Sequence, residues 1–461
     1  MYSEHNRAQE NSDTILLPGR DKWKPLLAEP LRGQALEAAS LVAEQLRNPD
    51  HLLTIAEMAA QQSALPPAAK YPVSNTFGFI GGAFPATYLA RCFPEQGWDR
   101  ITHRYLNPSG LSSLVFANLS LFGGASGLAM IMTLMSEEGK RYRKTLANLH
   151  TCLLEQVKQA AWFLRRSEGI AEGDYDLIRG ASGILAYLLF VPTPDAAVQA
   201  TIEILLDWLI HLASTDQESK RERWHVAQQF IILEESRQRY PDGYYNCGLA
   251  HGIPGPLAVL SLAWLAGYRT PGLQEAVRFL SDWIVQHALV DPWGITWSDV
   301  VPLEHSHSAE AWQTLSPART AWCYGTPGIA RALWLAGKAL EDALLCQTAI
   351  EAMEAVLRRP IAERRINSPT VCHGIAGLLA ICLRFAQEID NTTIREQIPV
   401  LVSQIMSHYN PDFPLGFRDL EPGGNAVDQT VWLTGAPGTM MVLLAASLPV
   451  EPAWDRVLLL S

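Results

Sequence analysis

The sequence has no long apolar run, no basic stripe and few cysteines, and each absence excludes a class of protein. A stretch of about 18 consecutive apolar residues is missing, so no membrane-spanning helix is expected. The formal net charge is −11, which argues against nucleic acid as the main partner. Seven cysteines are an odd and sparse number for 461 residues and favour a reducing compartment over a disulfide framework. Residues 1–13 lack the apolar core of a signal peptide, so we expect a cytoplasmic protein.

The domain organisation follows from length and from where the helical pattern begins. With 48% hydrophobic residues, the chain can bury a large core. Residues 1–30 show no sustained period, and we predict a poorly ordered lead-in. Residues 31–461 are predicted to form a single domain, with a possible surface insertion at residues 214–245 and a long loop at residues 291–318. Long loops in compact domains are often functional, so this loop is a candidate wall of a substrate site.

A Gly-x-x-Gly pair followed directly by an apolar run recurs along the chain. Six clear copies begin 49 to 73 residues apart, which leaves room for two helices and a loop each time. Any single copy would be ordinary turn chemistry, but six at this spacing predict a repeated helical hairpin. The clear copies begin at Gly124, Gly180, Gly252, Gly325, Gly374 and Gly435. A degenerate seventh copy begins at Gly78.

The two helices of each repeat differ in their apolar pattern. Residues 184–190 and 378–383, which follow glycine pairs, are apolar on all sides, as buried helices are. Residues 394–406 instead carry apolar side chains on one face at the helical period. Inner helices with outer helices packed around them make an all-α fold, an α/α toroid, the closed relative of the open helical solenoids. We expect seven hairpins, with the glycine turns gathered at one mouth.

Two cysteines and a histidine stand directly before two of these turns. Cys323 precedes the fourth turn, and Cys372 and His373 precede the fifth. Two thiolates and a neutral imidazole would fill three corners of a tetrahedral Zn²⁺ site and leave the fourth corner for water or an incoming ligand. The spacing also fits ordinary buried cysteines and a core histidine, because neither Cys-x-x-Cys nor His-Glu-x-x-His is present.

Further polar residues stand at equivalent turns. His251 abuts the third turn and could be a general acid or base, since its ordinary pKa of about 6.5 lies near neutrality. Asp176, before the second turn, could fix its tautomer, and Arg319 precedes the fourth turn. A core histidine, a helix N-cap and a structural ion pair are the alternative interpretations. Three residues are rival zinc ligands, for which burial or solvation is the simpler expectation: Cys247, His305 and His307.

As a set, these motifs resemble those of the lanthionine synthetase C-like proteins, the lantibiotic cyclases. The resemblance covers roughly residues 110–445 and includes order, spacing and the repeated glycines. The segments that carry it are Tyr175-Asp176 before a glycine pair, Gly248-Leu-Ala-His251-Gly252, Arg319 ahead of Cys323-Tyr324-Gly325, and Cys372-His373-Gly374.

The resemblance implies a toroid of seven inner and seven outer helices with one Zn²⁺ ion at its mouth. The implied activity is a zinc-dependent cyclase that adds precursor-peptide cysteine thiolates to dehydroalanine or dehydrobutyrine, forming (methyl)lanthionine thioether rings. A separate dehydratase would supply the dehydrated peptide, and a membrane transporter complex is a further candidate partner. The implied zinc ligands are Cys323, Cys372 and His373, and the implied catalytic residues are His251, Asp176, Arg319 and Tyr324.

Two alternatives belong to other functional classes. A non-catalytic scaffold could hold zinc and bind a peptide or glutathione without closing rings. A prenyltransferase-like toroid would also activate a thiol at zinc, but it would need a carboxylate ligand, and none is apparent near Cys323 or Cys372.

Overall fold

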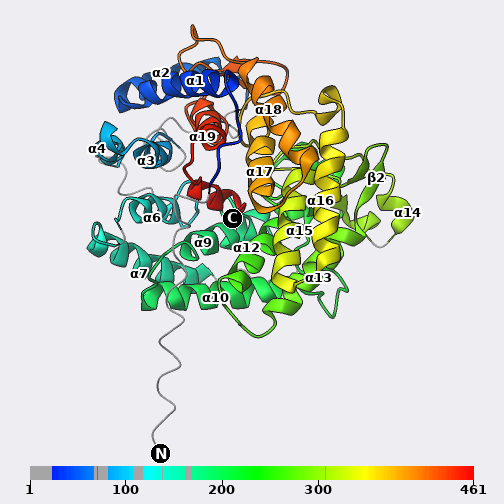
Figure 1. Cartoon of the computed structure of the whole chain (residues 1–461). Coiled ribbons are helices and arrows are strands. Elements are labelled where there is room, and N and C mark those ends of the chain that lie inside the picture. Colours follow the sequence, from blue (N-terminus) through cyan, green and yellow to red (C-terminus); the bar gives the residue numbers. More distant parts are fainter. Residues whose placement is uncertain are drawn as a thin grey trace, which may run out of the picture.

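The computed structural model describes residues 23–66, 70, 81–106, 118–137, 139–160, 169–306 and 308–461. Within these ranges, seven helices form an inner ring and seven others pack around it (Figure 1). The inner helices are α3 (Ala83–Cys92), α6 (Ala125–Leu134), α9 (Ala181–Leu188), α12 (Pro254–Leu265), α15 (Thr326–Leu340), α17 (Ile375–Glu388) and α19 (Ala436–Ser447). The outer helices are α1 (Leu31–Leu46), α4 (Trp98–Tyr105), α7 (Arg143–Ala160), α10 (Ala196–Leu212), α13 (Leu273–Gln286), α16 (Ala343–Arg358) and α18 (Thr392–Met406).

The inner ring is closed. Each inner helix packs against the next one in chain order, and α19 packs against α3. Six inner helices pack against the outer helix that follows them, whereas α19 packs against α1 from the start of the chain. The α/α toroid predicted from the repeats is therefore confirmed, and the N-terminal helix supplies the outer member of the seventh pair. Helix α3 follows the degenerate seventh copy, of which Gly78 lies outside the described residues.

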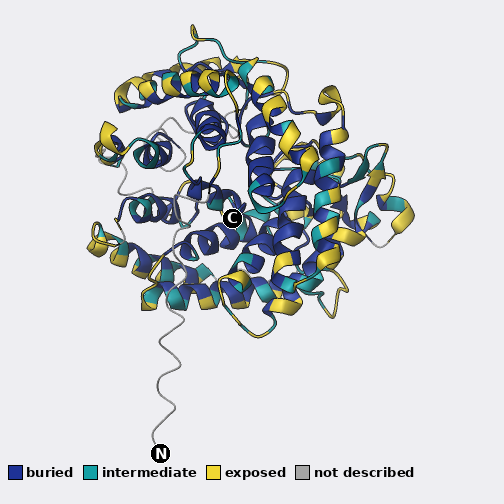
Figure 2. Ribbon diagram, in the orientation of Figure 1, coloured by how far each residue is buried: buried dark blue, intermediate teal, exposed yellow. Residues whose placement is uncertain are grey.

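Burial follows the two patterns read in the sequence. Every residue of α9 is buried, and α19 is buried on all sides. In α18, by contrast, Ile394, Ile398, Leu401, Val402 and Ile405 are buried on one face while the other face is open to solvent. Figure 2 shows the same division, with the inner ring dark blue and the exposed surface on the outer helices. No helix in the described ranges combines the length and the apolar character that crossing a membrane requires.

The connections carry short elements. The helices are α2 (Pro49–Gln62), α8 (Glu172–Tyr175), α11 (Glu234–Arg239) and α14 (Ala309–Trp312), and the 3-10 turns are η3 (Pro94–Gln96), η4 (Gln228–Phe230), η5 (Leu303–His305), η6 (Ile361–Arg364) and η7 (Ala453–Leu458). The strands form three antiparallel pairs: β1 (Tyr244–Asn246) with β4 (Val300–Pro302), β2 (Leu289–Asp291) with β3 (Gly294–Thr296), and β5 (Asp419–Leu420) with β6 (Ala426–Val427).

The two irregular stretches singled out in the sequence are joined to each other. Strand β1 ends the charged stretch at residues 214–245, and its partner β4 lies in the stretch at residues 291–318. The latter is therefore not a plain loop, since it contains strands, a 3-10 turn and α14. Because β1 runs directly into the third glycine turn, this pair flanks the mouth of the toroid.

The lead-in is packed where the structure describes it. Residues 1–22 lie outside the described residues, but Trp23 is buried and donates from its indole nitrogen to the carbonyl of Ala445 at 2.7 Å. The backbone of Lys24 exchanges two hydrogen bonds with the Gln387 side chain. A buried tryptophan and backbone hydrogen bonds thus hold residues 23–30 against α17 and α19, whereas most of the predicted lead-in lies outside the described residues.

The end of the chain lies inside the ring, where Figure 1 places the C-terminus. Residues 453–460 are buried except for the half-exposed Arg456. The carbonyl of Leu458 accepts a hydrogen bond from the Trp322 indole at 3.0 Å, and that of Leu460 accepts one from Arg331 at 2.7 Å. The C-terminal segment therefore fills the centre of the toroid and reaches the tryptophan next to Cys323.

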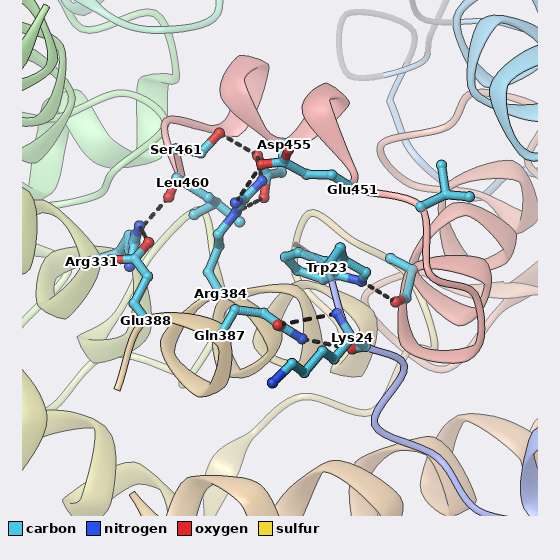
Figure 3. A network of polar contacts seen from close by, with 12 residues as sticks. Trp23, Lys24, Arg331, Arg384, Gln387, Glu388, Glu451, Asp455, Leu460 and Ser461 are labelled. Carbon is cyan, nitrogen blue, oxygen red and sulfur yellow. Dashed lines mark hydrogen bonds and ion pairs between the residues drawn. The ribbon is translucent and has the colours of Figure 1, made fainter. Parts of the chain in front are cut away.

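A buried ionic network holds this segment in place (Figure 3). Arg384 of α17 bonds Asp455 at 2.5 Å and Glu451 at 3.1 Å, and the side chains of all three are less than a tenth exposed. Ser461 donates its hydroxyl to the same Asp455 at 2.6 Å. The guanidinium also lies 5.0 Å from the ring of Trp23, so the network joins Trp23 and the C-terminal segment to one inner helix.

Replacing Arg384 tests this role. Arg384→Ala leaves two buried carboxylates without their cation, so we expect the free energy of unfolding to fall by about 3–5 kcal/mol in urea titrations. Arg395→Ala is the matched control, since its ion pair with Asp390 lies on the surface, and the urea midpoint should stay close to wild type. Equal midpoint shifts in the two variants would show that the central network adds no particular stability.

Candidate active site

The glycine turns meet because each is hydrogen-bonded to the next. In five neighbouring pairs of turns, a backbone N–H of one turn donates to a backbone carbonyl of the following turn at 2.8 to 3.3 Å. These bonds run from Phe122 to Ile178, Leu177 to Ala250, Ala250 to Cys323, Cys323 to Cys372, and Cys372 to Leu433. We call this series the turn ring. Residues that are far apart in the sequence are therefore fixed side by side at one mouth of the toroid, as the repeats predicted.

Glycine is required in these turns because the backbone doubles back on itself. A Cβ on Gly325 would stand 1.7 Å from the carbonyl oxygen of Arg319, and this glycine also has a φ of 123°. A Cβ on Gly374 would stand 2.2 Å from the carbonyl oxygen of Ser368. In both turns the crowded carbonyl belongs to the residue six positions earlier, so the copies share one backbone shape.

His251 and Asp176, predicted as a pair, are in direct contact. The Nδ1–H of His251 donates to Asp176 Oδ2 at 2.6 Å, and Asp176 is fully buried while the imidazole is 29% exposed. The other carboxylate oxygen accepts from the backbone N–H groups of Arg179 and Gly180 at 2.6 and 2.8 Å. Asp176 is thus both the turn's cap and the orienting group of His251, whose Nε2 is left for other chemistry.

The pKa of His251 is set by two opposing effects. Burial of the imidazole alone would lower the pKa, whereas the hydrogen bond and the negative charge of Asp176 raise it. The net result is a pKa above the ordinary value for histidine. The imidazole therefore holds a proton more readily near neutral pH than a free histidine does.

Cys323 and Cys372, in adjacent turns, form a hydrogen-bonded thiol pair. The hydrogen bond from the Cys372 thiol lowers the pKa of Cys323 to about 7, against the opposing effect of burial. The pKa of Cys372 is raised well above its usual value, because its proton is held in the hydrogen bond to the Cys323 sulfur and because the thiol is buried. The pair gives up one proton easily and retains the second, as expected for two sulfurs that share one small space.

His373 is oriented by a carboxylate that the sequence did not reveal. Its Nε2 bonds Asp419 at 3.1 Å, and the same carboxylate oxygen accepts from the Ser368 hydroxyl at 2.7 Å. Burial would lower the pKa of His373, but Asp419 raises it. Since Nε2 is taken, Nδ1 is the ring nitrogen available to a ligand. A carboxylate behind a histidine is the usual support of a metal-binding imidazole.

The types of donor atom in Cys323, Cys372 and His373 fit zinc, although the three side chains are not gathered around one point. Within the described ranges, no three His, Cys, Asp or Glu side chains are grouped closely enough to hold a metal ion. Two thiols that share a proton, with a carboxylate-backed imidazole on the next residue, are nevertheless the donor set of a Cys₂His zinc site with an open position.

Arg319 lies at the rim of the same site. Its side chain is exposed, and among the described residues no hydrogen bond or ion pair engages its guanidinium. Its positive charge lowers the pKa of both Cys323 and Cys372. The structural ion pair considered from sequence is thus not formed within the described residues, and the cation is available to an anionic group at the mouth.

Tyr324 belongs to a hydrogen-bonded group with two residues that sequence reasoning missed. The Nδ2 of Asn246 donates to the Tyr324 hydroxyl at 2.9 Å and to Glu172 Oε1 at 2.5 Å. Burial and the nearby Glu172 raise the pKa of Tyr324 well above its ordinary value, so the phenol keeps its proton. Asn246 could have been found from the repeats. It lies six residues before Gly252, and the equivalent position is polar in every clear copy: Asn118, Asp174, Asn246, Arg319, Ser368 and Gln429.

The rival zinc ligands have other surroundings. Cys247 is buried, and burial raises the pKa of its thiol to about 12, so it is the inert core cysteine that its spacing suggested. His305 is half-buried, and its Nδ1 has no hydrogen-bond partner among the described residues. His307 lies outside the described residues.

Comparisons with known proteins agree with this fold and these motifs. The nisin biosynthesis protein NisC of Lactococcus lactis subsp. lactis is 26% identical over 314 residues, which cover 68% of this chain and 73% of NisC. A solved structure named nisin cyclase superposes with a TM-score of 0.70 at 22% identity, covering 88% of this chain and 96% of that one. Residues 71–459 match the family described as lanthionine synthetase C-like protein. The chain belongs to the lanthionine synthetase C-like family.

Proposed function

We propose that this protein is a zinc-dependent lanthipeptide cyclase, which adds cysteine thiols of a dehydrated precursor peptide to dehydroalanine or dehydrobutyrine. Family membership and the similarity to a nisin cyclase support the reaction class. The observation that carries the proposal is that a hydrogen-bonded thiol pair lies at the same mouth as a histidine whose Nδ1 bonds a buried carboxylate. One half of this arrangement suits thiol activation and the other suits proton transfer.

Cys323, Cys372 and Nδ1 of His373 would hold the zinc ion. When bound, zinc lowers the pKa of a thiol and so supplies a thiolate nucleophile near neutral pH. Asp419 fixes the ring of His373 by taking Nε2. Two cysteine thiolates as ligands keep the site electron-rich, which preserves the reactivity of an incoming sulfur.

His251 would deliver the proton that completes the addition. When the sulfur attacks the β-carbon, the electron pair of the carbon–carbon double bond moves to the α-carbon and its carbonyl. The α-carbon then needs a proton, which a protonated imidazole can donate from Nε2 because Nδ1 is held by Asp176. Arg319, which has no anionic partner among the described residues, can stabilise the developing negative charge.

The proposal includes partners and a compartment. The substrate is a peptide that already contains dehydroalanine or dehydrobutyrine, so a separate dehydratase must act first. Free thiols at the site favour the reducing cytoplasm as the location. A membrane transporter complex remains a prediction, because a mature lanthipeptide must leave the cell in which it is made.

The zinc ligands and the proton donor are separable by mutation. Cys323→Ala and Cys372→Ala should lose both bound zinc and ring closure, whereas His251→Ala should keep zinc and lose about 10²–10⁴-fold in rate. Cys247→Ala is the control, because the Cys247 thiol lies in the core. This variant should keep both bound zinc and ring closure. Zinc content and free-thiol loss in a dehydrated precursor peptide are the measurements.

Ring closure by zinc-free Cys372→Ala at the wild-type rate would contradict the proposal. If the wild-type protein binds zinc and the peptide but leaves every thiol free, the non-catalytic scaffold is the correct function instead.

The proton-donor role of His251 predicts a pH effect. In Asp176→Asn the carboxylate charge is lost, so the pKa of His251 should fall below its wild-type value in an NMR titration of labelled histidine. Because the wild-type pKa is raised by folding, the pair stabilises the fold fully below the unfolded pKa of about 6.5. This contribution disappears as the pH rises through the folded pKa.

Asp195→Asn serves as the matched control, because Asp195 bonds Nδ1 of His150 at 2.9 Å in the same manner but outside the site. It should leave the pKa of His251 unchanged. An unchanged His251 titration in Asp176→Asn would show that the carboxylate does not tune the imidazole.

A further inference from the structure

The side-chain amide of Asn246 is held in a single orientation. The backbone N–H of Gly248 donates to one of its terminal atoms at 2.8 Å, and since an N–H can only donate, that atom is Oδ1. The other terminal atom, Nδ2, donates to Glu172 Oε1 at 2.5 Å and to the Tyr324 hydroxyl at 2.9 Å. Tyr244 donates to the same oxygen of Glu172 at 2.8 Å, and Asn246 is fully buried.

This orientation decides how the Tyr324 hydroxyl can act. Because both hydrogens of the amide nitrogen are donated, the tyrosine oxygen is the acceptor in its bond to Asn246. Its own proton must then point elsewhere. Among the residues that the structure describes, no acceptor takes that proton. The hydroxyl can therefore donate a hydrogen bond to a bound molecule.

The ring of Tyr324 is clamped at the mouth. Gly248 lies against the ring, where a Cβ would stand 2.7 Å from two ring carbons, so the ring has little room to turn. Its centroid is 6.2 Å from that of the His251 imidazole, and its backbone follows Cys323 directly. Tyr324 is thus a direct neighbour of both Cys323 and His251.

We propose that the Tyr324 hydroxyl donates a hydrogen bond to the carbonyl oxygen of the dehydroamino acid, and that Asn246 and Glu172 are positioning residues that keep it a donor. This inference rests on the proposed cyclase function. During addition, a sulfur–carbon bond forms and the π electrons move onto the α-carbon and the carbonyl oxygen. The tyrosine hydroxyl stabilises that oxygen without giving up its proton. His251 donates a proton to the α-carbon, which balances the proton that the thiol released.

The direction of the hydrogen bond can be reversed by one substitution. In Asn246→Asp the new carboxylate can still accept from Gly248, but it cannot donate to Tyr324. The tyrosine hydroxyl would turn to donate to it and would be lost to the substrate. We therefore expect Asn246→Asp and Tyr324→Phe each to lower kcat by about 10²-fold, with KM for the dehydrated peptide little changed.

A double variant separates this role from simple packing. If Asn246 acts through the hydroxyl, Tyr324→Phe/Asn246→Asp should be no slower than Tyr324→Phe alone. If the loss of kcat in the double variant equals the product of the two single losses, the residues act independently and the proposal is overturned.

Glu172 provides a second pair of variants, which are compared at equal thermal stability. Glu172→Gln keeps an acceptor oxygen for Asn246 and should retain most of the wild-type kcat, whereas Glu172→Ala leaves the amide free to turn and should lower kcat. Equal kcat values in these two variants, at equal thermal stability, would overturn the positioning role.

An infrared measurement separates failure of this inference from failure of the proposed function. The probe is a cysteine-free peptide with a ¹³C-labelled dehydrobutyrine carbonyl, which can bind but cannot react. Its carbonyl stretch should move to lower frequency on binding wild type, and this shift should be absent with Tyr324→Phe and Asn246→Asp. A shift in a wild-type protein that closes no rings would support the donor and reject the cyclase. Ring closure without any shift would reject the donor alone.

Discussion

The site depends on the backbone hydrogen bonds of the turn ring. Cys323 and Cys372 are 49 residues apart in the sequence, and the bond from the N–H of one to the carbonyl of the other places their side chains together. The next bonds in the series bring Ala250, and hence His251, to the same edge. These bonds need turns in which the backbone approaches closely, and so they need glycine. The arrangement of these side chains is thus a consequence of the repeat itself, since each copy presents the residues before its glycines to one mouth.

Two imidazoles at the mouth are each held by a buried carboxylate, but opposite nitrogens are used. Asp176 takes Nδ1 of His251, and Asp419 takes Nε2 of His373. The first histidine is left with Nε2, at the far end of the ring. The second is left with Nδ1, close to its own backbone and to the preceding Cys372. The same pairing therefore leaves a different ring nitrogen available in each turn, which is why we propose a proton donor in one turn and a metal ligand in the other.

The sequence predicted what depends on local pattern. Glycine spacing and the 3.6-residue period predicted the toroid, and the residues next to the glycines predicted the pairing of His251 with Asp176. Asp419 could not be found this way, because it lies 46 residues after His373 in a stretch with no repeat signal. The packing of Trp23 was missed for a similar reason, since its partner is 422 residues away. Contacts that depend on how the ring closes leave no periodic trace in the chain.

We propose that the turn ring brings Cys323, Cys372 and His373 together as the ligands of one zinc ion. The most direct measurement is the zinc K-edge X-ray absorption spectrum of the full-length protein loaded with one equivalent of zinc. Two sulfur neighbours at about 2.3 Å and an imidazole nitrogen at about 2.0 Å are expected, with a light-atom ligand in the fourth position. A spectrum with only nitrogen and oxygen neighbours, or a protein that retains no zinc through gel filtration, would contradict this ligand set.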